Sequence, residues 1–151
     1  MAFFTFSNAY TQNYRSAAGV RISYGGLFSY KHALNEKNYL EGILSVRWNG
    51  VVMTGLFEWQ QALDSKNLQW YAGTGIHAGV HGRNNVFQAE EDQNEAVQMN
   101  LGIDLIGGIE YVFKNVPIVV SADYKPAFYF TGDRWLVPEE FGLTARYIFE
   151  Y

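Results

Sequence analysis

The chain has 151 residues, enough for one domain, and it contains no cysteine, which excludes disulfide bonds and thiolate metal sites. Its formal net charge of −4 at pH 7 opposes a nucleic-acid partner, because such a partner normally requires a basic protein surface. Aromatic residues make up 17% of the chain and glycine occurs 15 times, a composition typical of proteins built from many short strands and tight turns.

The first twelve residues differ from the rest of the chain. They contain a short apolar stretch followed by Ser7, Asn8 and Ala9, which resemble the cleavage site of an export signal, although no basic segment precedes them. We expect residues 1–12 to be an N-terminal tail or a signal-peptide remnant, and residues 13–151 to form a single domain.

The remaining chain consists of segments in which apolar and polar residues alternate. A period of two places successive side chains on opposite faces of a β-strand. Glycines or polar residues separate the segments, and Asn49 with Gly50 is the strongest hairpin signal, since both residues tolerate positive φ. The expected strands are residues 14–24, 27–34, 39–48, 51–61, 68–81, 99–113, 117–130 and 141–151.

The number and spacing of these segments indicate the architecture. No apolar run approaches the roughly 20 residues of a membrane-spanning helix, whereas a membrane-spanning barrel strand needs only about 9–11 residues. Eight strands is an even number, as single-chain bacterial barrels require, and the connections at residues 82–98 and 131–140 are the longest. The sequence therefore predicts an all-β fold, an eight-stranded antiparallel up-and-down transmembrane β-barrel.

The last strand has the clearest alternation. Its apolar face carries Phe141, Leu143, Ala145, Tyr147, Phe149 and Tyr151. Its other face carries Gly142, Thr144, Arg146 and Glu150, and Ile148 alone interrupts the pattern. Alternation by itself does not say which face of the barrel wall is the outer one.

Charged residues suggest that the polar faces point into the barrel. An arginine on the lipid face at the bilayer midplane costs about 2–4 kcal/mol, so charged residues are favoured in the barrel interior. A charge that is unpaired in the interior would also cost several kcal/mol, so we expect the interior charges to be paired. Cationic and acidic residues occur in equal number in the polar phases, which predicts a network of ion pairs in the lumen. The expected members are Arg21, Lys31, Arg47, Glu41, Glu58, Asp104, Glu110, Asp123, Lys125 and Arg146.

Tyrosines and tryptophans occur near the ends of the apolar phases. This distribution is typical of the two aromatic girdles at the interfaces between a bilayer and water. We expect these residues to contact the membrane interfaces: Tyr14, Tyr24, Tyr39, Trp48, Trp59, Trp70, Tyr111, Tyr124, Tyr147 and Tyr151.

Five stretches resemble small eight-stranded bacterial outer-membrane barrels of the OmpA and OmpX architectural type, and look closest to a poorly characterised group of them. The stretches are residues 30–37, 54–58, 70–79 and 102–111 and the terminal strand. The resemblance implies a monomer in the bacterial outer membrane, with the lipid bilayer as its surroundings. It also implies that the barrel-insertion machinery reads the aromatic end of the last strand, here Tyr147, Phe149 and Tyr151.

Signatures of catalysis and of metal binding are weak. The chain contains no Gly-x-Ser-x-Gly, no phosphate-binding loop and no His-Glu-x-x-His motif. His77 and His81 are four residues apart on a strand, about 13 Å, which is too far for two ligands of one metal. The acidic stretch at residues 90–95 lacks the ligand spacing of a calcium-binding loop. We expect no catalytic residue, no metal site and no cofactor.

Three functional hypotheses remain open. The first is a non-enzymatic outer-membrane barrel for membrane anchorage, surface contact or envelope support, without a wide pore because side chains fill an eight-stranded barrel. The second is a lipid-modifying barrel enzyme, for which Ser45, His77 and Asp123 could supply a Ser-His-Asp group. The third is a soluble lipocalin-like carrier of an apolar ligand, with the faces of the wall reversed.

Overall fold

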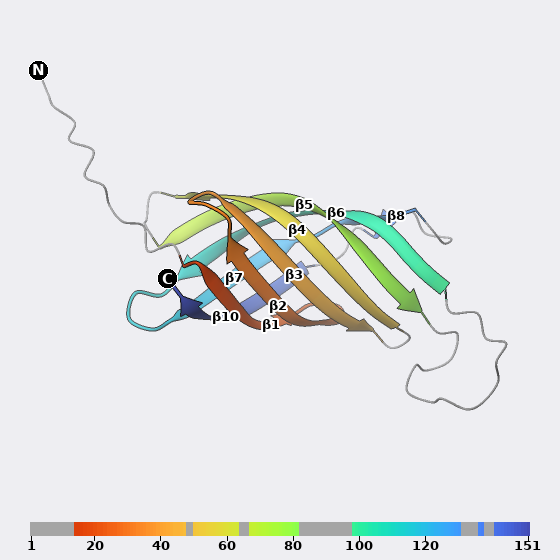
Figure 1. Ribbon diagram of the computed structural model, residues 1–151, viewed down its shortest axis with the longest axis horizontal. Coiled ribbons are helices and arrows are strands. Elements are labelled where there is room, and N and C mark those ends of the chain that lie inside the picture. Colours follow the sequence, from red (N-terminus) through yellow and green to blue (C-terminus); the bar gives the residue numbers. More distant parts are fainter. Residues whose placement is uncertain (1–13, 48–49, 64–66, 82–97, 131–135, 138–140) are drawn as a thin grey trace, which may run out of the picture.

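The computed structural model describes residues 14–47, 50–63, 67–81, 98–130, 136–137 and 141–151. These residues form strands and no helix, so none of the described chain is a helix long and apolar enough to cross a membrane. Figure 1 labels the strands other than β9. The strands are β1 (Ser16–Ile22), β2 (Gly26–Ala33), β3 (Asn38–Arg47), β4 (Gly50–Ala62), β5 (Leu68–His81), β6 (Gln98–Val112), β7 (Ile118–Tyr124), β8 (Ala127–Tyr129), β9 (Leu136–Val137) and β10 (Phe141–Glu150).

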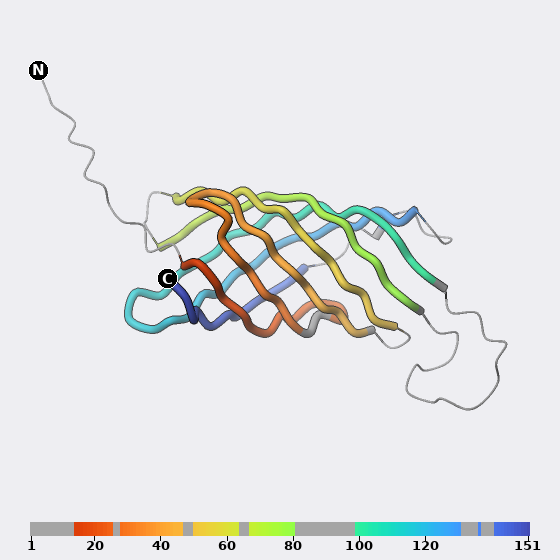
Figure 2. The backbone as a smooth tube through the Cα atoms, viewed as in Figure 1, coloured from red at the N-terminus to blue at the C-terminus, as the bar shows by residue number. Residues whose placement is uncertain are grey.

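The strands close into one antiparallel barrel. Each of β1 to β6 pairs with the next strand of the chain. β7 pairs with β10, and β10 pairs with β1, which closes the ring. Figure 2 shows the resulting tilted strands wrapping around a common axis. The predicted all-β, eight-stranded up-and-down barrel is confirmed.

The seventh barrel strand is interrupted where the sequence contains Pro126. Proline has no backbone N–H to donate to a strand ladder, so the strand divides into β7 and β8, which both pair with β6. The ladder continues across the break, because the Leu105 amide donates to the Pro126 carbonyl at 3.0 Å. The short β9 pairs with β8 on the side away from β6, as β10 pairs with β7, so β9 and β10 occupy the same place in the ring.

One end of the barrel carries the β2–β3 and β6–β7 turns and the chain's last residue, whereas the β1–β2 turn lies at the other end (Figure 1). In the β2–β3 turn, the Asn35 side-chain oxygen accepts hydrogen bonds from the Lys37 and Asn38 amides at 3.0 and 2.9 Å, an arrangement that stabilises a tight turn. In the β6–β7 turn, the Phe113 amide donates to the Ile118 carbonyl at 3.0 Å. We refer to this end as the turn end.

Polarity is inverted relative to a soluble protein. Arg21 and Asp104 are fully buried inside the barrel, whereas Met53, Ile76 and Leu143 on the outer wall are 67%, 70% and 59% exposed. Soluble barrels bury apolar side chains inside and expose polar ones, and membrane barrels do the reverse. Side-chain orientation in the described strands therefore follows the predicted assignment of faces.

Tyr14 lies inside the barrel, which corrects its assignment to a membrane interface. It is 1% exposed, and its hydroxyl donates a hydrogen bond to Glu110 at 2.8 Å. The pairing of β1 with β10 shifts register between Ser16 and Ala17, and both of these side chains are buried. An irregularity of this kind interrupts the alternation, so the face on which Tyr14 lies cannot be counted back from Arg21.

Tyr39 is also wrongly assigned to an interface. It precedes Glu41 by two residues, so both side chains must lie on the same face of β3, and Tyr39 is completely buried. Its ring lies 5.1 Å from the Lys31 ammonium group, a distance suited to a cation–π contact.

An apolar cluster fills the lumen near the turn end. Its buried members are Tyr14, Ala17, Tyr39, Val112, Val119 and Ile148. Ile148, which interrupted the alternation in the last strand, is 2% exposed and belongs to this cluster. Its apolar side chain on a polar face therefore packs against other apolar side chains within the lumen.

Candidate functional site

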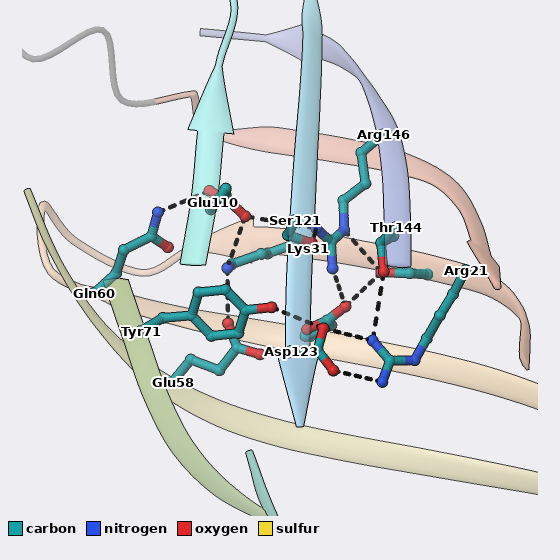
Figure 3. Close-up of polar contacts among 12 residues, drawn as sticks. Arg21, Lys31, Glu58, Gln60, Tyr71, Glu110, Ser121, Asp123, Thr144 and Arg146 are labelled. Carbon is teal, nitrogen blue, oxygen red and sulfur yellow. Dashed lines mark hydrogen bonds and ion pairs between the residues drawn. The ribbon is translucent and has the colours of Figure 1, made fainter. Parts of the chain in front are cut away.

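The lumen of the barrel holds a network of buried ionic groups, and this network is the candidate site. Figure 3 shows side chains from β1, β2, β4, β5, β6, β7 and β10 converging on it. Period-two alternation directs every second side chain of each strand inward, and closure of the sheet brings these side chains within reach of one another. Residues that are far apart in the sequence therefore become direct partners.

Arg146 of β10 has four side-chain partners in the network, as many as Glu110. Its guanidinium forms an ion pair with Glu41 and a longer one, at 3.5 Å, with Glu110. The same group donates hydrogen bonds to the Ser29 hydroxyl at 2.8 Å and the Ser121 hydroxyl at 3.0 Å. A planar guanidinium has five donors, so it can join four strands of the barrel at once.

Lys31 of β2 joins two carboxylates. Its ammonium group lies 2.7 Å from Glu58 and 3.2 Å from Glu110, and all three side chains are completely buried. The ammonium group also lies 4.2 Å from the centre of the Tyr71 ring. Burial of these charges is tolerable only because they are paired, since an isolated ion inside a protein costs several kcal/mol.

Arg21 and Asp123 form a bidentate pair. Two guanidinium nitrogens donate to the two carboxylate oxygens at 2.6 and 2.7 Å, the geometry in which this pair is strongest. The Tyr71 hydroxyl donates to the same carboxylate at 2.8 Å. Gly142 makes room for this arrangement, because a Cβ atom at that position would overlap the Arg21 guanidinium.

A third group lies on β5, β6 and the break between β7 and β8. Asp104 accepts a hydrogen bond from Lys125 at 2.8 Å and lies 2.7 Å from Nδ1 of His77. The His77 ring packs 4.4 Å from the Tyr129 ring, and its Nε2 is buried without a hydrogen-bond partner. Gly102 is required here, since a Cβ atom at that position would overlap the His77 ring.

Nine of the ten charged residues expected in the lumen are buried there with oppositely charged partners. The side chain of the tenth, Arg47, lies outside the described residues. The neutral partners that complete the network were not singled out from the sequence. They are Ser29, Gln60, Tyr71, Ser121 and Thr144, which share the inward phase of their strands and could have been found by that criterion.

The remaining aromatic residues expected at interfaces are placed as follows. Tyr24, Trp59, Tyr111, Tyr124, Tyr147 and Tyr151 are exposed on the outer wall, Trp70 is half-buried beside Trp59, and Trp48 lies outside the described residues. Trp59, Trp70 and Tyr111 lie near the turn end of their strands, and the ring centres of the two tryptophans are 5.9 Å apart. Phe149, expected with Tyr147 and Tyr151 to form the insertion signal, is 55% exposed.

The Ser-His-Asp group considered for catalysis is not formed. Asp123 is bound to Arg21 and Tyr71, while the carboxylate partner of His77 is Asp104. Within the described part of the chain, no three histidine or acidic side chains are arranged to hold a metal ion. The acidic stretch at residues 90–95 lies outside the described residues.

The fold and the lumen define a closed eight-stranded antiparallel β-barrel with an ionic interior and an apolar outer wall. Its architecture is that of the N-terminal β-barrel domain of OprF from Pseudomonas aeruginosa, with a TM-score of 0.60 at 13% sequence identity. The match covers 87% of this chain and 93% of the OprF domain. No protein-family model and no curated protein matches the chain.

Proposed function

We propose that this chain is an integral outer-membrane β-barrel protein without enzymatic activity, which serves membrane anchorage, surface contact or envelope support. The observation that carries the proposal is the inverted polarity of the wall. Exposing side chains such as Met53, Ile76 and Leu143 to water would be costly over a whole barrel surface, whereas hydrocarbon accommodates them.

The filled lumen supports a structural role over transport. Arg146, Lys31 and Arg21 are each held by carboxylates from other strands, and the apolar cluster around Ile148 fills the lumen near the turn end. A barrel of eight strands has an interior that side chains just fill. We therefore propose that the network stabilises the barrel from within and that the outer surface makes the functional contacts.

The outward aromatic side chains at the end of β10 and of the residue that follows it support the proposed route into the membrane. Tyr147, Phe149 and Tyr151 are 59%, 55% and 64% exposed, so their rings are accessible on the outer wall. We propose that the barrel-insertion machinery binds this face of β10 during assembly. Monomeric insertion into the outer membrane is part of the same proposal.

Refolding tests the membrane environment. The full chain, diluted from urea into buffer, detergent micelles or phospholipid vesicles, should fold only in micelles and vesicles. The folded form should migrate differently on a denaturing gel before and after boiling, as a closed barrel does. A monodisperse folded monomer in detergent-free buffer would overturn the proposal, and recovery of the produced protein from the inner membrane of a Gram-negative host would overturn the proposed location.

A lipid-modifying enzyme is the second candidate, and one observation favours it. The Asp104 carboxylate lies beside Nδ1 of His77, and Nε2 of His77 has no hydrogen-bond partner among the described residues. A histidine that acts as a general base has this arrangement. Mass spectrometry of outer-leaflet lipids from producing cells separates the two candidates. A lipid change that disappears in His77→Ala would favour the enzyme, and unchanged lipids favour the structural role.

The carrier hypothesis has the least support. A lipocalin-like carrier needs an apolar pocket inside the barrel and a polar surface outside. The described residues have the opposite distribution, with Glu58 and Glu110 buried in the lumen and Ile76 exposed on the wall.

A further inference from the structure

A hollow in the apolar outer wall is centred on two glycines. Gly42 of β3 and Gly55 of β4 are direct partners in the sheet, and both face outward. A Cβ atom added to either glycine would meet no other atom within 4 Å. Over these two neighbouring positions the wall is therefore thinner by the depth of one side chain, and the missing volume lies on the outside.

Large side chains surround this hollow. Across the sheet, Tyr30 is paired with Gly42 and Ile76 with Gly55. Along the strands, two residues in either direction, the Leu44–Met53 pair and the Leu40–Phe57 pair form the remaining sides. The depression is thus bounded on four sides by aromatic or aliphatic groups.

The hollow is the meeting point of two apolar grooves. One, of about 800 Å³, extends from Phe28 on β2 to Leu101 on β6. The other, of about 550 Å³, extends toward Phe57 and His32. Both are lined by Gly42 and Gly55, so they form a continuous depression, which we call the glycine groove. With strands spaced about 4.8 Å apart, the distance from β2 to β6 is about 19 Å, long enough for most of a phospholipid acyl chain.

Polar groups lie where the glycine groove reaches the turn end of β1 and β2. The His32 ring stacks on Tyr30, with ring centres 6.4 Å apart, and its Nδ1 lies 2.8 Å from the Ser16 hydroxyl. Arg15 is adjacent, because its carbonyl accepts a hydrogen bond from the Ala33 amide at 2.7 Å. A guanidinium and an imidazole are suited to binding a phosphate.

The current partner of Arg15 does not prevent such binding. Arg15 lies 3.7 Å from Glu150, and the two side chains are 63% and 47% exposed. An exposed pair at this distance contributes about 0–1 kcal/mol. A phosphate that accepts two hydrogen bonds from the guanidinium can therefore compete with the carboxylate.

We propose that the glycine groove is a specific phospholipid site, in which one acyl chain lies across Gly42 and Gly55 and the phosphate binds Arg15 and His32. This inference rests on the proposed function, since it requires the outer wall to face a bilayer. The lipid belongs to the leaflet at the turn end, where Arg15 and His32 lie. Its chain fills the hollow that the two glycines leave in the wall.

Filling the hollow tests the site without disturbing the fold. In Gly42→Leu/Gly55→Leu the new side chains enter open space, and leucine is tolerated in a strand better than glycine, so the variant should fold as well as the natural chain. Gly107→Leu is the matched control. Gly107 also faces outward with nothing within 4 Å of an added Cβ, but it lines neither groove.

The full chain is folded in mixed micelles of detergent and phosphatidylethanolamine and then transferred to detergent alone. Native mass spectrometry measures the fraction of the protein that keeps a bound lipid. We expect one lipid to stay bound to the natural chain and to Gly107→Leu, and at least a tenfold smaller bound fraction in Gly42→Leu/Gly55→Leu. Arg15→Gln should lower the bound fraction several-fold for phosphatidylethanolamine and leave binding of diacylglycerol, which lacks a phosphate, unchanged.

Any one of the following outcomes would overturn the site. One is equal lipid retention by the natural chain and by the double glycine variant. Another is an equal loss of bound lipid in the double variant and in Gly107→Leu. A further one is a dimer of the natural chain that only the double variant abolishes, because a second copy of the chain would then occupy the groove. Gel migration before boiling establishes that each sample is folded. A natural chain that folds in detergent but retains no lipid therefore refutes the site alone, whereas a chain that folds without detergent refutes the proposed function.

Discussion

Replacing Arg146 by methionine probes the lumen network most directly. The substitution keeps an unbranched apolar stem and removes the charge that pairs with Glu41 and Glu110. Glu110 would keep its contacts with Lys31 and Tyr14, at 3.2 and 2.8 Å. Glu41 would keep the hydrogen bond from the Ser29 hydroxyl, at 2.5 Å, but would lose the cation that pairs with it, so most of the penalty falls on Glu41.

The expected magnitude follows from the burial of these groups. Removing one partner of a buried ion pair leaves an uncompensated charge and costs about 3–5 kcal/mol of unfolding free energy. Glu41→Gln removes that stranded charge, so Arg146→Met/Glu41→Gln should cost about 1–3 kcal/mol less than the sum of the two single variants. Lys114→Met, which removes an exposed charge in the β6–β7 turn, should stay within about 0.5 kcal/mol of the natural chain.

Reversible urea unfolding in phospholipid vesicles, followed by the fluorescence of the 4 tryptophans, gives these free energies. The reasoning is refuted if Arg146→Met lowers stability no more than Lys114→Met does. It is also refuted if the effects of Arg146→Met and Glu41→Gln simply add, because additive effects would mean that the two side chains are not coupled.

Three further predictions use the same unfolding measurement. Ile76→Arg places a charge on the outer wall and should cost about 2–4 kcal/mol in vesicles, whereas Ile76→Leu should cost under about 1.5 kcal/mol; equal effects would contradict a lipid-facing Ile76. Asp104→Asn removes the charge that pairs with Lys125 and His77 and should cost about 3–5 kcal/mol; a neutral result would contradict the pairing. Ile148→Ala should cost about 2–5 kcal/mol through a cavity in the apolar cluster, and a loss below about 1 kcal/mol would contradict its burial.

Strand positions and the orientation of most side chains could be predicted because both depend on local alternation. In β10, for example, Thr144 and Arg146 are buried while Leu143 and Tyr147 are exposed, as the period of two requires. The up-and-down order of the strands also follows from local signals, since each hairpin needs only neighbouring strands and a turn. The pair that closes the ring, β1 with β10, joins the two ends of the chain and is not local.

The pairing of charges across the lumen could not be predicted. Arg146 and Glu41 are 105 residues apart, and their contact depends on the tilt and stagger of the closed barrel, which no local pattern encodes. Tyr14 shows a second limit, because a register shift at one position changes the face of every residue before it. The hollow at Gly42 and Gly55 shows a third, since it exists only where two strands align two glycines.

The account depends on the claim that the outer face of the barrel wall contacts lipid. Spin labelling tests this claim. The chain has no cysteine, so single cysteines at Met53, Ile76 and Leu143 can each carry one nitroxide on the outer wall. In vesicles, all three labels should collide frequently with oxygen, which concentrates in hydrocarbon, and rarely with a water-soluble nickel complex. Frequent collisions with nickel and few with oxygen at these positions would contradict a lipid-facing wall.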